Sequence, residues 1–380
     1  MRPERLLQAA AFSSTFDRFV IPPMLVAIAR DFGVPFDRAA LAASSYFFLY
    51  GACQLLWGAI ADRLGLIRVM RATMVLAGIA GLASALAPTL TTLVIARGVT
   101  GGLFGATIPS VIIYIGDTSS PERRQHVLAD MIAALALATA LATAVGGLCA
   151  AYLDWRVGFA IPAVTALVLV RALGSLPAPG VHRSAGAAEQ IAMVFRERWA
   201  VFILAFMLLE GAIFFGAATF LAPALQNAGY SSAVAGLAVG LYGLSDFAWA
   251  RAARLAIDRL GPHGMIAAGG VIATAGYATG ALSVSIIGIA VTGVLVGGGF
   301  IFLHSTMQAW ATQVVPAARA MMLALFATTL FVGGSLGTAV LAPLAADARF
   351  ALIFALAAAT AVPLVVVAAL ARRRYGTGVA

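Results

Sequence analysis

The sequence predicts an all-α membrane protein with twelve transmembrane helices in two pseudo-symmetric six-helix bundles. The first observation is composition: the 380 residues are 62% hydrophobic and only 10% charged, with a mean hydropathy of +1.00. Soluble domains have about 45–50% apolar and about 25% charged residues. A water-soluble core could not hide this much apolar surface, so lipid is expected to be the main solvent. The other two observations are the number of apolar stretches and an internal repeat.

Each predicted helix corresponds to one apolar stretch long enough to cross a bilayer, which takes about 20 residues. The chain contains twelve such stretches, at residues 7–30, 40–60, 70–88, 91–115, 127–149, 157–176, 200–222, 232–250, 264–283, 287–310, 320–343 and 350–371. Asp17 and Arg18 interrupt the first stretch, and no clear cleavage site follows it. We therefore expect this stretch to be a span and not a cleaved signal peptide.

The longest connection, residues 177–199, divides the spans six and six. We predict an N-terminal bundle over residues 1–176, a cytoplasmic linker over 177–199 and a C-terminal bundle over 200–380. The two halves also resemble each other. Val-Thr-Gly-Gly-Leu-Phe at 99–104 matches Leu-Val-Gly-Gly-Gly-Phe at 295–300, and Asp-Arg-Leu-Gly at 62–65 recurs at 258–261. Both matches have the same offset of 196 residues, which indicates an internal duplication.

The distribution of arginine predicts the orientation in the membrane. All 24 basic residues are arginine. With the N-terminus inside, four lie in outer connections (Arg30, Arg38, Arg156 and Arg349), two lie within spans, and the remaining 18 lie on the inner side. Basic residues concentrate in cytoplasmic loops. We therefore expect a multi-pass protein of a bacterial inner membrane with both termini in the cytoplasm, and the net charge of +9 does not require a nucleic-acid partner.

Several enzyme and cofactor chemistries are excluded by the residues that are absent. Without lysine there is no phosphate-binding P-loop lysine and no Schiff base with retinal or pyridoxal phosphate. Cys53 and Cys149 fall in apolar stretches, as small core residues do. The Gly-x-Ser-x-Gly pattern at 333–337 lies in an apolar stretch, whereas a serine nucleophile needs a strand-to-helix elbow. We expect no enzyme activity, no cofactor and no metal.

The connection between spans two and three carries a charged motif. Residues 58–68 have the pattern Gly58-x-x-x-Asp62-Arg63-x-Gly65-x-x-Arg68, which resembles the loop signature of the major facilitator superfamily. Gly58 would let two helices approach closely, and Gly65 would permit a tight turn. With the second copy, Asp258 and Arg259, the charges would form a cytoplasmic gate that latches and releases the bundles. The alternative is a solvated turn. The second copy has Arg254 in place of Gly58.

Three further stretches resemble this superfamily. Residues Arg97 to Gly105 are similar to its Arg-x-x-x-Gly-x-x-x-Gly pattern. Asp154-Trp155-Arg156 resembles a motif of its drug-efflux members, and so does Asp17 with Pro22 and Pro23 further along the same span. The resemblance implies the branch of drug:proton antiporters. The antiporter signature Gly-Pro-x-x-Gly-Gly is incomplete, because residues 142–147 read Ala-Thr-Ala-Val-Gly-Gly.

Ionisable residues inside spans indicate function, because each costs at least about 2.5–3.5 kcal/mol to insert. Asp17 and Arg97 would face each other if spans one and four are antiparallel. A carboxylate whose proton affinity changes between two states could couple transport to protons, whereas a static ion pair is the alternative. Glu210 would be a second protonation site, a group for cationic substrates or a permanently protonated acid. Asp246 is assigned to proton coupling, with a water-facing gate charge as the alternative.

Other residues are candidates for lining a substrate cavity: Arg18, Tyr46, Tyr50, Gln54, Phe214, Tyr242, His304 and Gln308. Tyr46, Tyr50 and Gln54 share one face of span two, and His304 and Gln308 share one face of span ten. Packing within the bundles is the alternative for these aromatic and polar side chains.

The resemblance implies a secondary transporter. We predict proton-coupled export of a small amphipathic compound or drug by alternating access, with a small-molecule substrate, protons and the lipid bilayer as partners and a monomer as the unit. The alternative is proton-coupled import of an organic anion or metabolite, with Arg18 and Arg97 binding its carboxylate. Uncoupled facilitation and a non-transporting receptor are further alternatives.

Overall fold

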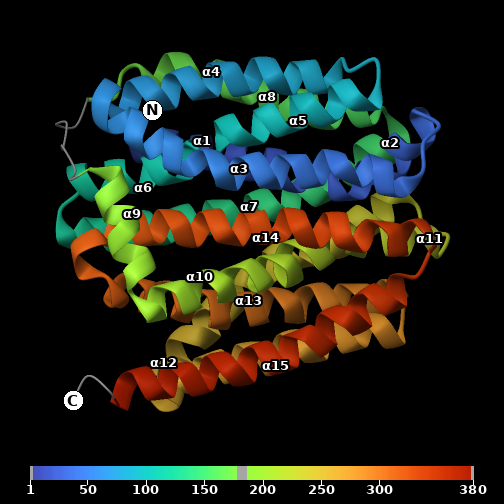
Figure 1. The fold of residues 1–380 in the computed structure, drawn as a ribbon. Helices are drawn as coiled ribbons and strands as arrows, with labels where there is room; N and C mark the ends of the chain where they lie inside the picture. Colours follow the sequence, from blue (N-terminus) through green and yellow to red (C-terminus); the bar gives the residue numbers. More distant parts are fainter. Residues whose placement is uncertain (1–2, 178–185, 378–380) are drawn as a thin grey trace.

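A computed structural model describes residues 3–177 and 186–377, and all regular elements in these ranges are helices (Figure 1). The first half contains α1 (Pro3–Phe19), η1 (Pro22–Met24), α2 (Leu25–Asp31), α3 (Phe36–Leu64), α4 (Leu66–Ala85), α5 (Leu90–Phe104), α6 (Thr107–Thr118), α7 (Pro121–Tyr152) and α8 (Trp155–Leu173). The second contains α9 (Ala187–Arg196), α10 (Arg198–Gly211), η2 (Ala212–Gly216), η3 (Ala217–Phe220), α11 (Leu221–Asn227), α12 (Ser232–Leu282), α13 (Ile286–Val314), η4 (Pro316–Ala318), α14 (Arg319–Ala346) and α15 (Phe350–Thr377).

Eleven stretches of the described chain are long and apolar enough to cross a membrane, and one of them makes two passes. This is α12, whose 51 residues would extend about 77 Å if straight, more than twice the hydrocarbon core of a bilayer. Gly261 breaks it with a φ of 63°, which favours glycine. The twelve predicted passes are thus present. Residues 251–260, expected as part of a connection, instead continue the helix to this kink.

The two halves share local geometry at the offset of the sequence repeat. Gly65 has a φ of 91° at the turn between α3 and α4, and Gly261 occupies the equivalent turn. A side chain on Gly101 would collide with the carbonyl oxygen of Tyr46, and one on Gly297 would come 3.2 Å from the carbonyl oxygen of Tyr242. Both pairs are 196 residues apart, so the same close helix contact is built twice and the pseudo-symmetric fold is confirmed.

Three spans are broken near the middle of their length. The first changes from α1 to η1 at Pro22 and Pro23, and the fourth changes from α5 to α6 at Gly105 and Ala106. The seventh contains a π-helical turn, η2, directly after Glu210 and Gly211. Proline has no amide hydrogen, and π turns occur often at functional sites. These breaks place Asp17 and Glu210 beside irregular backbone.

The bundles meet along α3 with α14 and along α7 with α12. Ser44 on α3 and Ser335 on α14 are hydrogen bonded at 3.0 Å, and Gly147 on α7 packs against Gly236 on α12. The Gln226 side chain also donates to the Pro23 carbonyl oxygen at 2.9 Å. Figure 1 shows both termini and α9 at one end of the molecule, with α2 and α11 at the other. These contacts therefore join the bundles mainly in the half away from the termini.

The predicted linker contains a helix, α9, whose Val194 is fully buried against the C-terminal half. Residues 178–185 of that linker, with Arg183, lie outside the described residues, as does Arg2. The division into segments 1–176, 177–199 and 200–380 stays a prediction.

Candidate substrate and proton-coupling site

Asp17 and Arg97 form a fully buried ion pair between α1 and α5. Arg97 Nη1 lies 2.9 Å from Asp17 Oδ1, and Nη2 donates to Oδ2 at 3.1 Å and to the Asp17 carbonyl oxygen at 2.9 Å. The exposed fraction of both side chains is 0%. The expected contact between these residues is therefore present, while its role in proton coupling stays a prediction.

Aromatic rings enclose the Arg97 guanidinium. Its carbon lies 4.5 Å from the Tyr46 ring centre and 4.4 Å from that of Phe159. Gly101 positions this group, because the absence of a side chain lets α5 approach Tyr46 on α3. Arg97 is thus occupied by a carboxylate and two rings. A substrate carboxylate would have to share Arg97 with Asp17, and its binding by Arg97, the alternative in the sequence analysis, stays a prediction.

Arg18 follows Asp17 in the chain but has different partners. Its Nη2 donates to Thr15 Oγ1 at 3.2 Å, and its guanidinium carbon lies 4.8–5.2 Å from the ring centres of Phe19, Tyr50 and Phe331. Phe331 belongs to α14 of the other bundle. The side chain is therefore placed where the two bundles meet.

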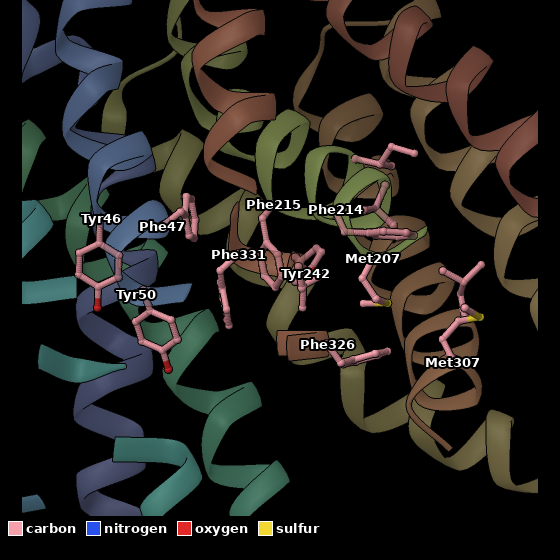
Figure 2. Packing of buried hydrophobic residues seen from close by; sticks show 14 of the residues in the cluster. Tyr46, Phe47, Tyr50, Met207, Phe214, Phe215, Tyr242, Met307, Phe326 and Phe331 are labelled. Carbon is pink, nitrogen blue, oxygen red and sulfur yellow. The ribbon is translucent and has the colours of Figure 1, made fainter. Parts of the chain in front are cut away.

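The predicted face of α3 is buried at this junction. Tyr46, Tyr50 and Gln54 are at most 7% exposed, and the two tyrosine rings stack with centres 5.9 Å apart. Figure 2 shows Phe331 and Phe215 lying between these tyrosines and Phe214. The Tyr50 and Phe331 ring centres are 4.5 Å apart, and those of Phe331 and Phe215 are 5.4 Å apart. Aromatic packing thus joins α3 to both α14 and η2.

Glu210 and His304 form a pair that the sequence analysis did not predict. His304 Nδ1 lies 2.8 Å from Glu210 Oε1, linking α10 to α13, and the exposed fraction of the Glu210 side chain is 0%. Glu210 Oε2 is buried without a hydrogen-bond partner. Phe300 stacks on the His304 ring at 4.5 Å, and Phe214 lies 5.5 Å from Phe300. The two residues are 94 positions apart in the chain, so no local pattern could have indicated their contact.

Replacing His304 with alanine should lower the thermal stability of the purified protein. The change leaves both Glu210 carboxyl oxygens buried without a partner, which costs about 1–3 kcal/mol. The double variant Glu210→Leu/His304→Leu should recover much of this loss, since no polar group remains unsatisfied. Unfolding midpoints of both variants and the wild type in one detergent would test this. Equal midpoints for His304→Ala and the wild type would contradict a stabilising pair.

The remaining cavity candidates are dispersed. Tyr242 lines a cavity of about 30 Å³ with Phe19, Phe47, Thr143 and Phe215. A cavity of this volume is far too small for a drug-sized ligand. Gln308 is exposed on α13. Asp246 on α12 is half-buried, and in the described part of the chain no ion pair or hydrogen bond joins it to Asp17 or Glu210.

The charged residues of the predicted gate lie at the surface on the side of the termini. Asp62, Arg63 and Arg68 are exposed around the turn between α3 and α4, and Asp258 and Arg259 are exposed near the kink of α12. No atom lies within 4 Å of the position that a Gly58 side chain would take. The expected close helix contact at Gly58 was wrong for this structure, because the bundles meet in the other half.

Twelve membrane passes in two related six-helix bundles, with charged groups buried midway along the spans, form the architecture of secondary transporters. A family model described as "Major Facilitator Superfamily" matches residues 9–338. The chain belongs to the Major Facilitator Superfamily and is a multi-pass membrane protein. Members of this family are transporters and not enzymes, which agrees with the prediction for this chain.

Curated relatives match parts of the chain at low identity. "Uncharacterized MFS-type transporter YfhI" of Bacillus subtilis is 27% identical over 64% of this chain and 62% of its own length. The "3-(3-hydroxy-phenyl)propionate transporter" of Escherichia coli is 33% identical over 30% of this chain and 28% of its own. "Puromycin resistance protein pur8" of Streptomyces alboniger is 27% identical over 45% and 34%, respectively. The matched regions span less than two thirds of each relative.

Solved structures resemble the chain over almost its whole length. A mutant of the nucleoside transporter NupG has a TM-score of 0.82 at 15% identity and covers 97% of this chain and 99% of its own. The xylose transporter XylE from Escherichia coli has a TM-score of 0.73 at 15% identity, covering 93% and 95%. At these identities the likeness establishes the fold alone.

Proposed function

We propose that the chain is a proton-coupled secondary transporter that exports a small amphipathic compound by alternating access. The observation that carries this proposal is the buried pair formed by Asp17, midway along span one, and Arg97 on span four. Inserting two charges into a membrane is expensive, which favours a functional role for the pair. Asp17 also lies two residues before the end of α1, so a small movement of this helix end would change its distance to Arg97.

In this mechanism Asp17 accepts a proton in one state of the transporter and releases it in the other. Contact with Arg97 favours the ionised carboxylate, while loss of that contact in a buried site favours the protonated one. Rocking of the two bundles would alternate these environments. Glu210 with His304 would be a second proton-binding pair in the C-terminal bundle, and Asp246 a third candidate. The charged residues around Asp62 and Asp258 would hold the two bundles together on the side of the termini when the bundles close there.

The relatives support export only weakly. Drug resistance, named in the Streptomyces relative, is an expected consequence of exporting a drug. The Escherichia coli relative is named for transport of an aromatic carboxylate, 3-(3-hydroxy-phenyl)propionate. A specific observation favours this second candidate function, proton-coupled import of an organic anion: Arg18 is a buried cation without a carboxylate partner among the described residues.

Proton movement in proteoliposomes tests the proposed function. Vesicles containing the purified protein and a pH-sensitive dye would receive gradients of cationic, neutral and anionic amphipathic compounds. We expect a substrate gradient to drive protons in the opposite direction. Protons that move together with an anion would support the importer instead. Substrate flux without any proton signal would contradict proton coupling and leave Asp17 and Arg97 as a structural pair.

A further inference from the structure

Arg18 is a buried cation whose charge is not neutralised by the protein. Its exposed fraction is 6%, and it lies near the middle of the first span, Pro3–Asp31. Arginine keeps its proton in proteins. No ion pair joins it to a carboxylate in the part of the chain that the structure describes, because Asp17 is bound to Arg97 and Glu210 to His304.

Arg18 also uses little of its hydrogen-bonding capacity. A guanidinium has five N–H donors. One contact, Nη2 to Thr15 Oγ1 at 3.2 Å, is made, and Nε is buried without a partner. Arg97 also has a buried Nε without a partner, but its two other nitrogens bind the Asp17 carboxylate and carbonyl groups, so its charge is neutralised. A buried donor without an acceptor is unfavourable, and an anionic acceptor that enters at Arg18 would also neutralise a charge that no carboxylate of the described residues pairs with.

The surroundings of Arg18 consist of aromatic rings from both bundles. Phe19 and Tyr50 come from the N-terminal bundle and Phe331 from the C-terminal one, all within 5.2 Å of the guanidinium carbon. Phe331 continues this wall to Phe215, as Figure 2 shows. Because the rings belong to two bundles, separation of the bundles would open a space between them. The present cavity of about 30 Å³, which Phe19 and Phe215 line, adjoins that junction.

These features select the chemistry of a ligand. The planar fork of a guanidinium matches the two oxygens of a carboxylate. The ring faces accept a flat apolar body and offer few hydrogen-bond partners to a sugar or a peptide. A single negative charge is sufficient, because one arginine is available. An aromatic monocarboxylate satisfies all three conditions.

We propose that Arg18 is the anion-binding residue of a central substrate site for aromatic monocarboxylates, in which Phe19, Tyr50 and Phe331 hold the ring. This inference rests on the proposed transport function but not on its direction. The other source of a carboxylate is the protein itself. Asp17 or Asp246 could pair with Arg18 after the bundles move, and the experiment must separate a bound ligand from this internal partner.

Ligand binding to the purified full-length protein in detergent tests the proposal without requiring transport. The probes are 3-phenylpropionate, its uncharged amide, and butyrate, which has the carboxylate but no ring. We expect 3-phenylpropionate to raise the unfolding temperature and to bind more tightly than either control compound. Arg18→Gln should weaken this binding roughly ten- to a hundredfold, because a hydrogen bond to a charged group is lost. Arg18→Lys should retain part of it.

The control variant is Arg38→Gln, which removes an exposed arginine at the start of α3. It should bind 3-phenylpropionate as the wild type does. Without ligand, Arg18→Gln should unfold at or above the wild-type temperature, since a buried unpaired charge is removed. Equal binding of the acid and its amide, or a large loss of ligand-free stability in Arg18→Gln, would overturn the proposal in favour of a structural role or an internal carboxylate partner.

The outcome of this binding experiment does not depend on whether transport is coupled to protons. Binding of 3-phenylpropionate that depends on Arg18, combined with flux that moves no protons, would leave this inference intact and refute the coupled mechanism. Proton-coupled flux of neutral or cationic compounds, combined with equal binding of acid and amide, would do the reverse.

Discussion

Asp17→Asn is expected to abolish substrate-driven proton movement while retaining exchange of substrate across the membrane. Asparagine has nearly the same shape as aspartate and can still accept a hydrogen bond from Arg97, but it cannot bind and release a proton. The carrier would therefore resemble a permanently protonated state. Dye-loaded proteoliposomes measure the proton movement, and labelled substrate on both sides of the membrane measures the exchange.

The stability of the Asp17→Asn protein must be measured together with its transport. Removing one partner of a buried ion pair costs about 3–5 kcal/mol, because the Arg97 charge stays buried. The double variant Asp17→Asn/Arg97→Gln removes both charges and should recover part of the stability without recovering coupling. Asp31→Asn is the matched control, since it breaks an exposed pair with Arg156 that is worth about 0–1 kcal/mol. A folded Asp17→Asn protein with wild-type proton movement would refute the role of Asp17.

A leucine at Gly147 should reduce transport about fivefold or more by preventing closure of the bundles away from the termini. Any side chain at this position would collide with the Ser232 carbonyl oxygen, and its first carbon would lie 3.0 Å from the Gly236 Cα atom. Overpacking of a close contact costs about 1–3 kcal/mol, which corresponds to a factor of about 5–150 in the population of the closed state. The protein should still fold, because each bundle keeps its own contacts.

Thiol labelling measures whether Gly147→Leu opens the contact between α7 and α12. Thr143→Cys, in a chain without Cys53 and Cys149, introduces a reporter at a position that is 3% exposed and whose carbonyl oxygen packs against Gly236. Labelling should be slow in this background and faster after Gly147→Leu is added. Gly116→Leu is the matched control, because no atom lies within 4 Å of its added carbon. Unchanged transport and labelling in Gly147→Leu would show that this contact is not needed for alternating access.

Much of the fold could be predicted because each membrane span is specified locally. The lipid requires a long apolar stretch for every pass, so hydropathy alone located all twelve. The repeat at an offset of 196 residues predicted the equivalent turns at Gly65 and Gly261. The contact between Asp17 and Arg97 was also predictable, because few charges are buried in the spans and antiparallel neighbours bring these two to similar depth.

Only the tertiary structure decided which other side chains meet. The pairing of Glu210 with His304, the isolation of Arg18 among rings and the open surroundings of Gly58 depend on the rotation and tilt of each helix. The rotation and tilt of the helices result from close packing at glycines such as Gly101 and Gly147. Each of these glycines packs against a helix that is distant in the sequence. The sequence by itself therefore determined the number of spans, their internal repeat and one ion pair. The choice of partners across the bundles was decided by packing, because no short pattern of residues records how two distant helices face each other.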